Sequence, residues 1–264
     1  MLKTDYERFK SFFMSRMQTY SAEEEIIREN LELKFKHTKM VCENTVQITE
    51  HLKLKETEQL LALTIALFHD LGRFEQFIKY RTFVDRNSVD HALLGKKILE
   101  ESEILQGLSN TEQEIILQSV FLHNKFSLSL DLGEEQRLQL KIIRDADKWD
   151  IFRVFAEYFS ATNGRKNSAI EGDLPETEGY NSQILNDILE GRNTSSEFVQ
   201  NLTDSRMYRL SWLYDLNFSF TKKRIRESGY VESMIKAIPQ EIPRRMLERH
   251  FAEYLNNNIL YKGE

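Results

Sequence analysis

The sequence LLALTIALFHDLGRF, residues 60–74, decides how the chain folds. From residue 60 to residue 68 it is apolar on every side of a helix, with one threonine inside, which predicts a helix that its neighbours bury. The run ends in His69 and Asp70, and we interpret Gly72 as the stop of that helix. Adjacent helical side chains point about 100° apart. His69 and Asp70 can therefore face one centre only near a helix end or a distortion.

The rest of the chain is also patterned for helices. Apolar residues recur at spacings of three and four, and the best strand-like alternation is the short stretch 126–132. Hydrophobic residues make up 41% of the 264 residues, enough for a sizeable core, and all three prolines lie after residue 170. We expect an all-α fold, with helices near 3–18, 22–51, 57–70, 88–101, 111–125, 134–161, 180–191, 194–201, 204–216, 218–237 and 241–256.

Composition excludes several classes of protein. Cys42 is the single cysteine, so neither an intrachain disulfide nor a thiolate zinc cluster can form. The longest apolar run has nine residues, whereas a membrane-spanning helix needs about 20. The first residues are charged and carry no secretory signal, so we expect a cytoplasmic protein without a membrane partner. A net charge of −6 argues against nucleic acid as a partner.

Histidines and aspartates fall on the apolar faces of four predicted helices. His37 continues the stripe of Leu33 and Val41, and comparable stripes carry His91, His123 and the aspartates at 147 and 150. For any one histidine, the alternative is a core side chain satisfied by hydrogen bonds. Buried imidazole and carboxylate groups must be hydrogen-bonded, paired or bound to a metal. One metal centre accounts for all of them together.

The types of side chain narrow the choice of metal. Imidazoles and carboxylates without a thiolate suit a divalent transition metal, namely iron, manganese, nickel, cobalt or zinc, better than calcium, with magnesium left open. Six candidate ligands exceed what one open catalytic site needs, so we expect one or two ions. A carboxylate such as Asp70 could then bridge two ions and hold a shared hydroxide.

These residues resemble the HD-domain superfamily, which consists largely of metal-dependent phosphohydrolases of all-helical fold. The family pattern is a lone histidine, an adjacent His-Asp pair and a distant aspartate, and it is matched by His37, His69-Asp70 and Asp147. The segment RDADKWD, residues 144–150, resembles the last motif, in which the aspartate before the lysine is the metal ligand. That likeness assigns Asp147 rather than Asp145. The resemblance covers roughly residues 30–155.

Binuclear members of the superfamily carry two further histidines between the pair and the last aspartate. His91 and His123 fit those places by their order and helical context. The stretch DHALLG is similar to one in the cyclic-dinucleotide phosphodiesterases of the superfamily, but their Gly-Tyr-Pro triplet does not occur in this chain. The stretch DADKWD is similar to deoxynucleotide triphosphohydrolases. The resemblance therefore implies metal-dependent phosphate ester hydrolysis, but it does not identify the substrate.

The activity implied is phosphate ester hydrolysis by a metal-activated hydroxide, on a nucleotide or another small phosphorylated substrate. Asp70, Arg73 and Lys148 would be the catalytic residues, and Arg73 and Lys148 would also bind the substrate phosphate as cations beside the ligands. Two alternatives stay open. The same six ligands serve di-iron oxygenases of the superfamily, and a third hypothesis is a regulatory module that binds a nucleotide. The sequence leaves an oligomer open as well.

The domain organisation expected is a single all-helical HD domain over residues 1–264. Its HD core would cover about residues 30–160, and a C-terminal helical extension about residues 170–264. A loop-rich break near residues 163–165 and 171–175 separates the two, but it lacks the long polar composition of a free linker.

Overall fold

The computed structural model describes residues 1–20, 24–126, 131–161, 167–172 and 174–257, and the regular secondary structure of these residues is entirely helical. The structure is therefore all-α, as predicted. The chain divides into two compact units, Met1–Asp147 and Lys148–Glu264, and each is described by itself. That the whole chain forms a single domain stays a prediction.

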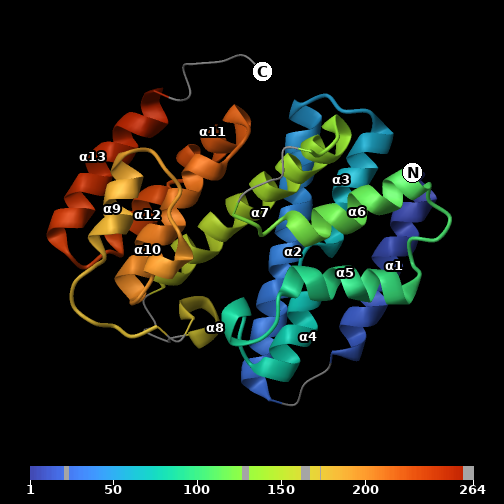
Figure 1. Cartoon of the computed structure of the whole chain (residues 1–264), viewed down its shortest axis with the longest axis horizontal. Helices are drawn as coiled ribbons and strands as arrows, with labels where there is room; N and C mark the ends of the chain where they lie inside the picture. The colour runs from blue at the N-terminus through green and yellow to red at the C-terminus, as the bar shows by residue number, and fades with distance from the viewer. Residues whose placement is uncertain (21–23, 127–130, 162–166, 173, 258–264) are drawn as a thin grey trace. The chain divides into compact units, whose positions relative to one another are not determined.

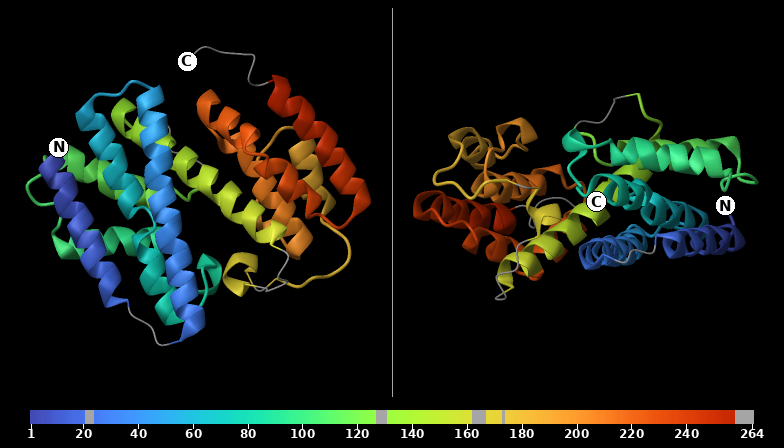
Figure 2. Two further views of the ribbon diagram at one scale, coloured as in Figure 1. Left: turned by 180° about the vertical axis from the view of Figure 1, so that it is seen from behind. Right: turned by 90° about the horizontal axis from the view of Figure 1, so that it is seen from below.

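The described residues of the first unit form these α-helices (Figure 1): α1 Lys3–Thr19, α2 Glu25–His51, α3 Glu56–Phe68, α4 Leu71–Tyr80, α5 His91–Ser102, α6 Asn110–Leu122 and the first half of α7 Glu134–Ser160. The long helix α2 packs against α3 and α4, α5 packs against α4 and α6, and α3 also contacts α1 and α6 (Figure 2). A hydrogen bond of 3.1 Å from Asn44 Nδ2 to the carbonyl oxygen of Ala146 joins α2 to α7.

The predicted apolar helix forms the centre of this unit. Ile65, Ala66 and Phe68 of α3 are fully buried, and the Phe68 ring lies 5.8 Å from the ring of Phe9 on α1. Helix α5 begins because Asp90 is its N-cap and accepts hydrogen bonds from the backbone amides of Ala92 and Leu93.

Helix α4 corrects the sequence analysis, which predicted no helix over residues 71–80. α3 ends at Phe68, Asp70 is the N-cap position of α4, and Gly72 lies inside α4 rather than at a helix stop. The reason for a glycine here is a close approach between helices. A Cβ on Gly72 would lie 2.2 Å from the carbonyl oxygen of His91 and 2.7 Å from the amide nitrogen of Gly95.

In the second unit, the part that the structure describes contains the second half of α7 and the α-helices α8 Ser168–Glu171, α9 Ser182–Leu189, α10 Leu202–Ser211, α11 Ser219–Glu227, α12 Tyr230–Lys236 and α13 Glu241–Asn257. Helix α9 packs against α10 and α13, and α12 packs against α10, α11 and α13. The buried Asp204 accepts hydrogen bonds from the backbone amides of Asn181 and Gln200, which fastens two loops to the start of α10.

Two predicted helices of this unit differ from the structure. The predicted helix 218–237 is two helices, because Gly229 adopts a φ of 70° between α11 and α12, a left-handed conformation that ends a helix. The predicted helix 194–201 is a short 3₁₀ turn, Ser196–Phe198. The strand-like stretch 126–132 and the break at 163–165 fall wholly or largely outside the described residues. Across those residues, none of the helices combines the length and the apolar composition needed to span a lipid bilayer.

Candidate metal centre

The predicted ligands come from separate helices of the first unit. His37 lies in the middle of α2, His91 is the first residue of α5, His123 directly follows α6, and Asp147 lies on α7. His69 and Asp70 form the junction between α3 and α4. His69 keeps helical torsion angles, whereas Asp70 departs from them with φ −104° and ψ 18°. This break in the helix lets two adjacent side chains face one centre, as the sequence analysis required.

Four donor atoms form a first cluster. His37 Nε2 lies 3.3 Å from His69 Nε2 and 3.1 Å from Asp147 Oδ1, and His69 Nε2 lies 3.8 Å from the same Asp147 oxygen. Asp70 Oδ2 lies 3.6 Å from the Nε2 atom of each of these two imidazoles. Ligands at about 2.1 Å from a divalent ion stand about 3.0–3.5 Å apart. His37, His69 and Asp70 lie close enough together to hold one ion, and Asp147 Oδ1 lies beside both imidazoles.

A second cluster lies beside the first. His91 Nε2 is 3.2 Å from His123 Nε2, and Asp70 Oδ1 lies 3.4 Å from the former and 3.8 Å from the latter. Asp70 thus presents one carboxylate oxygen to each pair of imidazoles. A carboxylate shared in this way is the arrangement that bridges two metal ions about 3.5–4 Å apart. These His and Asp groups could hold one or two metal ions.

Hydrogen bonds fix which nitrogen of each ring faces the centre. His69 Nδ1 lies 2.7 Å from the carbonyl oxygen of Ala66, and His123 Nδ1 lies 2.7 Å from that of Val120. A carbonyl only accepts hydrogen bonds, so each Nδ1 carries the proton and donates it. Each Nε2 is left with its lone pair toward the clusters, which is the state that a metal ligand needs.

The burial of the centre favours the protonation states that bind metal. Burial lowers the pKa of His69 and His91, and burial together with the neighbouring imidazoles lowers the pKa of His123 to about 3. Burial raises the pKa of Asp70, but Lys34, His69 and Arg73 outweigh it and hold that pKa well below its usual range. At neutral pH His69, His91 and His123 are therefore neutral and Asp70 is ionised.

The structure adds a cation that the sequence analysis missed. Lys34 Nζ lies 2.7 Å from Asp70 Oδ2 and 5.3 Å from the centre of the Phe83 ring. Lys34 stands three residues before His37, so both side chains leave α2 on one side. That spacing of three residues is the sequence signal for Lys34.

Arg73, a predicted substrate-binding residue, lies next to the two clusters. Its Nε is 3.6 Å from Asp70 Oδ1, and its Nη1 donates to Asp85 Oδ1 at 2.8 Å, to Gln76 Oε1 and to the carbonyl oxygen of Phe83. Within the described part of the chain, the buried Nε makes no hydrogen bond. Arg73 therefore brings one unused donor to the edge of the centre.

Lys148, the other predicted substrate-binding residue, belongs to the second unit. Its Nζ lies 2.8 Å from Asp215 Oδ2. The predicted contact of Lys148 with substrate stays a prediction.

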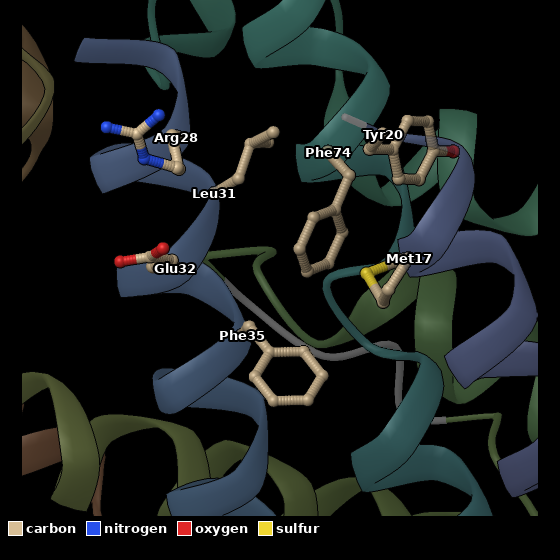
Figure 3. A pocket seen from close by; sticks show the side chains of 7 residues that line it. All are labelled: Met17, Tyr20, Arg28, Leu31, Glu32, Phe35 and Phe74. Carbon is tan, nitrogen blue, oxygen red and sulfur yellow. The ribbon is translucent and has the colours of Figure 1, made fainter. Parts of the chain in front are cut away.

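The first unit also contains a cavity of about 330 Å³ that is separate from the clusters. It lies between α1, α2 and α4 (Figure 3); Met17, Leu31, Phe35 and Phe74 are its main apolar walls, and Arg28 and Glu32 border it. Phe35 and His37 stand two positions apart on α2, so their side chains leave the helix about 160° apart. The cavity thus belongs to another face of α2 than the candidate ligands.

The fold and the site together define an all-helical protein with a buried cluster of histidine and aspartate side chains that could hold divalent metal. Residues 35–151 match the family model of the HD domain, and this range includes all six predicted ligands. This part of the chain is an HD domain, as the sequence motifs predicted. HD domains bind divalent metals and occur in metal-dependent phosphohydrolases. Comparisons with curated proteins and with solved structures gave no significant match to the chain.

Proposed function

We propose that the protein is a metal-dependent phosphohydrolase with two divalent ions at its active site. Its substrate would be a nucleotide or another small phosphate ester. The observation that carries the proposal is the position of Asp70, whose two oxygens lie within 3.8 Å of two separate pairs of imidazoles. His37, His69, Asp70 and Asp147 would hold one ion, and Asp70, His91 and His123 the other.

The donor set fits this chemistry because it is mixed nitrogen and oxygen and contains no thiolate. Bound divalent ions supply Lewis acidity toward phosphoryl oxygens and lower the pKa of a water molecule to near neutrality. The protein's own contribution is to hold the buried imidazoles of His69, His91 and His123 neutral and the buried carboxylates of Asp70 and Asp147 ionised. Asp70, Arg73 and Lys148 would be the catalytic residues, and Asp70 would contact both ions.

Cations of the chain would bind the substrate phosphate. Arg73 has a buried Nε without a hydrogen-bond partner in the described residues, and Lys34 Nζ lies at Asp70 Oδ2. Both could donate to phosphate oxygens as negative charge develops on them. Lys148 is retained as a further substrate-binding residue, on the strength of the motif that contains it. A cytoplasmic location, and a single domain with an HD core of about residues 30–160, are parts of the same proposal.

The test is metal analysis of protein purified without chelators, followed by a screen of nucleotides, phosphomonoesters and phosphodiesters with added Mn²⁺. We expect about two ions per chain and phosphate release that the His69→Ala variant loses. Protein that retains no transition metal and leaves the whole panel intact would overturn the proposal. Substrate-dependent oxygen uptake with a mixed-valent iron signal would instead assign the oxygenase alternative. Nucleotide binding that survives His69→Ala without turnover would assign a regulatory module.

A further inference from the structure

His91 is oriented by a side chain, whereas His69 and His123 are oriented by backbone carbonyls. Its Nδ1 lies 2.7 Å from Asp85 Oδ2 and 3.0 Å from Asp85 Oδ1. An ionised carboxylate only accepts hydrogen bonds, so the Nδ1 of His91 carries the proton. The Nε2 lone pair then faces His123 and Asp70. A histidine held by a carboxylate in this way is a better metal ligand than a free one.

Asp85 also holds Arg73. Asp85 Oδ1 accepts hydrogen bonds from Arg73 Nη1 at 2.8 Å and from Gln76 Nε2 at 2.9 Å. Arg73 Nε lies only 3.6 Å from Asp70 Oδ1, which is the oxygen of the second cluster. One carboxylate therefore fixes a candidate ligand and holds Arg73 by its Nη1, so that Arg73 Nε stays 3.6 Å from the oxygen that the second ion needs, beyond hydrogen-bond distance.

A third metal site is the competing interpretation of this region. Asp85, Asp90 and His91 carry donor atoms close enough together to hold an ion. However, Arg73 pairs with Asp85 and Lys125 pairs with Asp90, so two cations already neutralise the two carboxylates. The His91 atom that faces Asp85 is the protonated Nδ1, which has no lone pair to offer. The group is therefore a hydrogen-bonded support.

We infer that Asp85 is a positioning residue that sets the occupancy of the second metal subsite, formed by Asp70, His91 and His123. The inference rests on the proposed two-ion centre. Removing Asp85 should weaken binding of the second ion in two ways. His91 loses the hydrogen bond that orients its ring, and Arg73 is released toward Asp70 Oδ1, where its positive charge competes with the ion. The first subsite, with His37, His69 and Asp147, does not depend on Asp85.

The experiment measures Mn²⁺ and Zn²⁺ binding to the full chain by equilibrium dialysis, with the metal quantified in wild type, Asp85→Ala and Asp85→Asn. We expect wild type to bind one tight and one weaker ion. In Asp85→Ala the tight ion should bind with unchanged affinity. The weaker ion should bind about 10- to 100-fold less tightly, which is the usual effect of removing a hydrogen-bond partner of a ligating histidine. Asp85→Asn should fall between them, because it retains one acceptor oxygen for Nδ1–H.

The matched control is Asp90→Ala on the same loop. Asp90 caps α5 at the backbone amides of Ala92 and Leu93, so its loss should destabilise the start of that helix. The second ion should nevertheless remain, because Asp90 does not orient the His91 ring. If Asp90→Ala loses the second ion as readily as Asp85→Ala does, general damage to α5 explains the effect and the inference is wrong.

A double variant tests the role of Arg73. Adding Arg73→Ala to Asp85→Ala should restore part of the affinity for the second ion, because the guanidinium that competes with this ion for Asp70 is then absent. Two ions with unchanged affinities in both Asp85 variants would overturn this inference while leaving the proposed function intact. One ion in wild type would instead overturn the two-ion centre itself, so the two failures are distinguishable.

Discussion

Gly72 and the carbonyl oxygen of His91 are so close that a methyl group on Gly72 would lie 2.2 Å from that oxygen. Helices α4 and α5 therefore cross in backbone contact, next to the residue that begins α5 and is a candidate ligand. A clash with backbone cannot be relieved by rotating a side chain. The glycine thus couples the packing of two helices to the geometry of the second cluster.

Replacing Gly72 with alanine should lower the free energy of unfolding by about 3 kcal/mol, at the upper end of the usual range for overpacking. The variant should also bind the second ion more weakly, because α5 must move away from α4 and carries His91 with it. Denaturant titration of the metal-free protein measures the first effect. Gly133→Ala is the control, since nothing lies within 4 Å of its added methyl group. Equal stability of the two variants would contradict the contact.

Removing Asp70 should affect both metal subsites at once. Its two oxygens face different pairs of histidines, so Asp70→Ala should leave less than one ion per chain, whereas His123→Ala should leave one. His51→Ala should leave the full complement, because His51 is exposed at the end of α2. Metal content after gel filtration measures all three. If Asp70→Ala retained as much metal as His123→Ala, its carboxylate would not be shared.

The sequence was enough to predict the all-α fold, because that depends on local pattern, and the resemblance to the HD-domain superfamily supplied the six candidate ligands. A histidine in a helical apolar stripe, such as His37 or His123, marks a polar atom that must find a partner in the core. The structure brings all six of these side chains together. A sequence pattern does not reveal the role of a residue when that role depends on how segments far apart in the chain approach each other.

Gly72 illustrates that limit. A glycine after an apolar run usually ends a helix, and the sequence gives no sign that another backbone lies against it. The apolar helix does end close to the predicted position, at Phe68, but Gly72 lies inside a second helix, α4, which the sequence analysis does not predict. Asp85 was missed for a related reason: its role appears only when the segment between α4 and α5 folds back onto His91. Lys34 is different, because its helical spacing from His37 was visible in the sequence.

Cys42 should react slowly with alkylating agents in the folded protein. Burial, with a smaller contribution from Glu43, raises the pKa of its thiol from 9.0 to about 12. The reactive species is the thiolate, and a shift of about three pKa units leaves about 1000-fold less of it at pH 8. The raised pKa also means that stability from this group is complete below pH 9 and is lost as the pH rises toward 12.

The iodoacetamide reaction of the single cysteine, followed by mass spectrometry at pH 8, measures this difference against the guanidinium-unfolded chain. We expect a native rate at least about 100-fold slower, rising with pH toward 10 as thiolate forms. Alkylation of the folded protein at the unfolded rate would show that the thiol is accessible and ionises normally.

Lys34 should contribute to turnover rather than to metal binding. Its ammonium lies 2.7 Å from Asp70 Oδ2, at the edge of the first cluster, and is the closest cation to Asp70 in the described part of the chain. Lys34→Ala should lower kcat for phosphate release by about 100-fold, the effect of removing one preorganised donor to developing negative charge. The metal content should not fall, because Lys34 is not one of the candidate ligands and contacts the centre only through Asp70 Oδ2. Lys36→Ala, on an exposed position of the same helix, is the matched control and should retain full activity. A Lys34→Ala protein that loses metal together with activity would show that the lysine supports the centre instead of acting on substrate, whereas loss of kcat at constant metal content places its charge at the reacting phosphate.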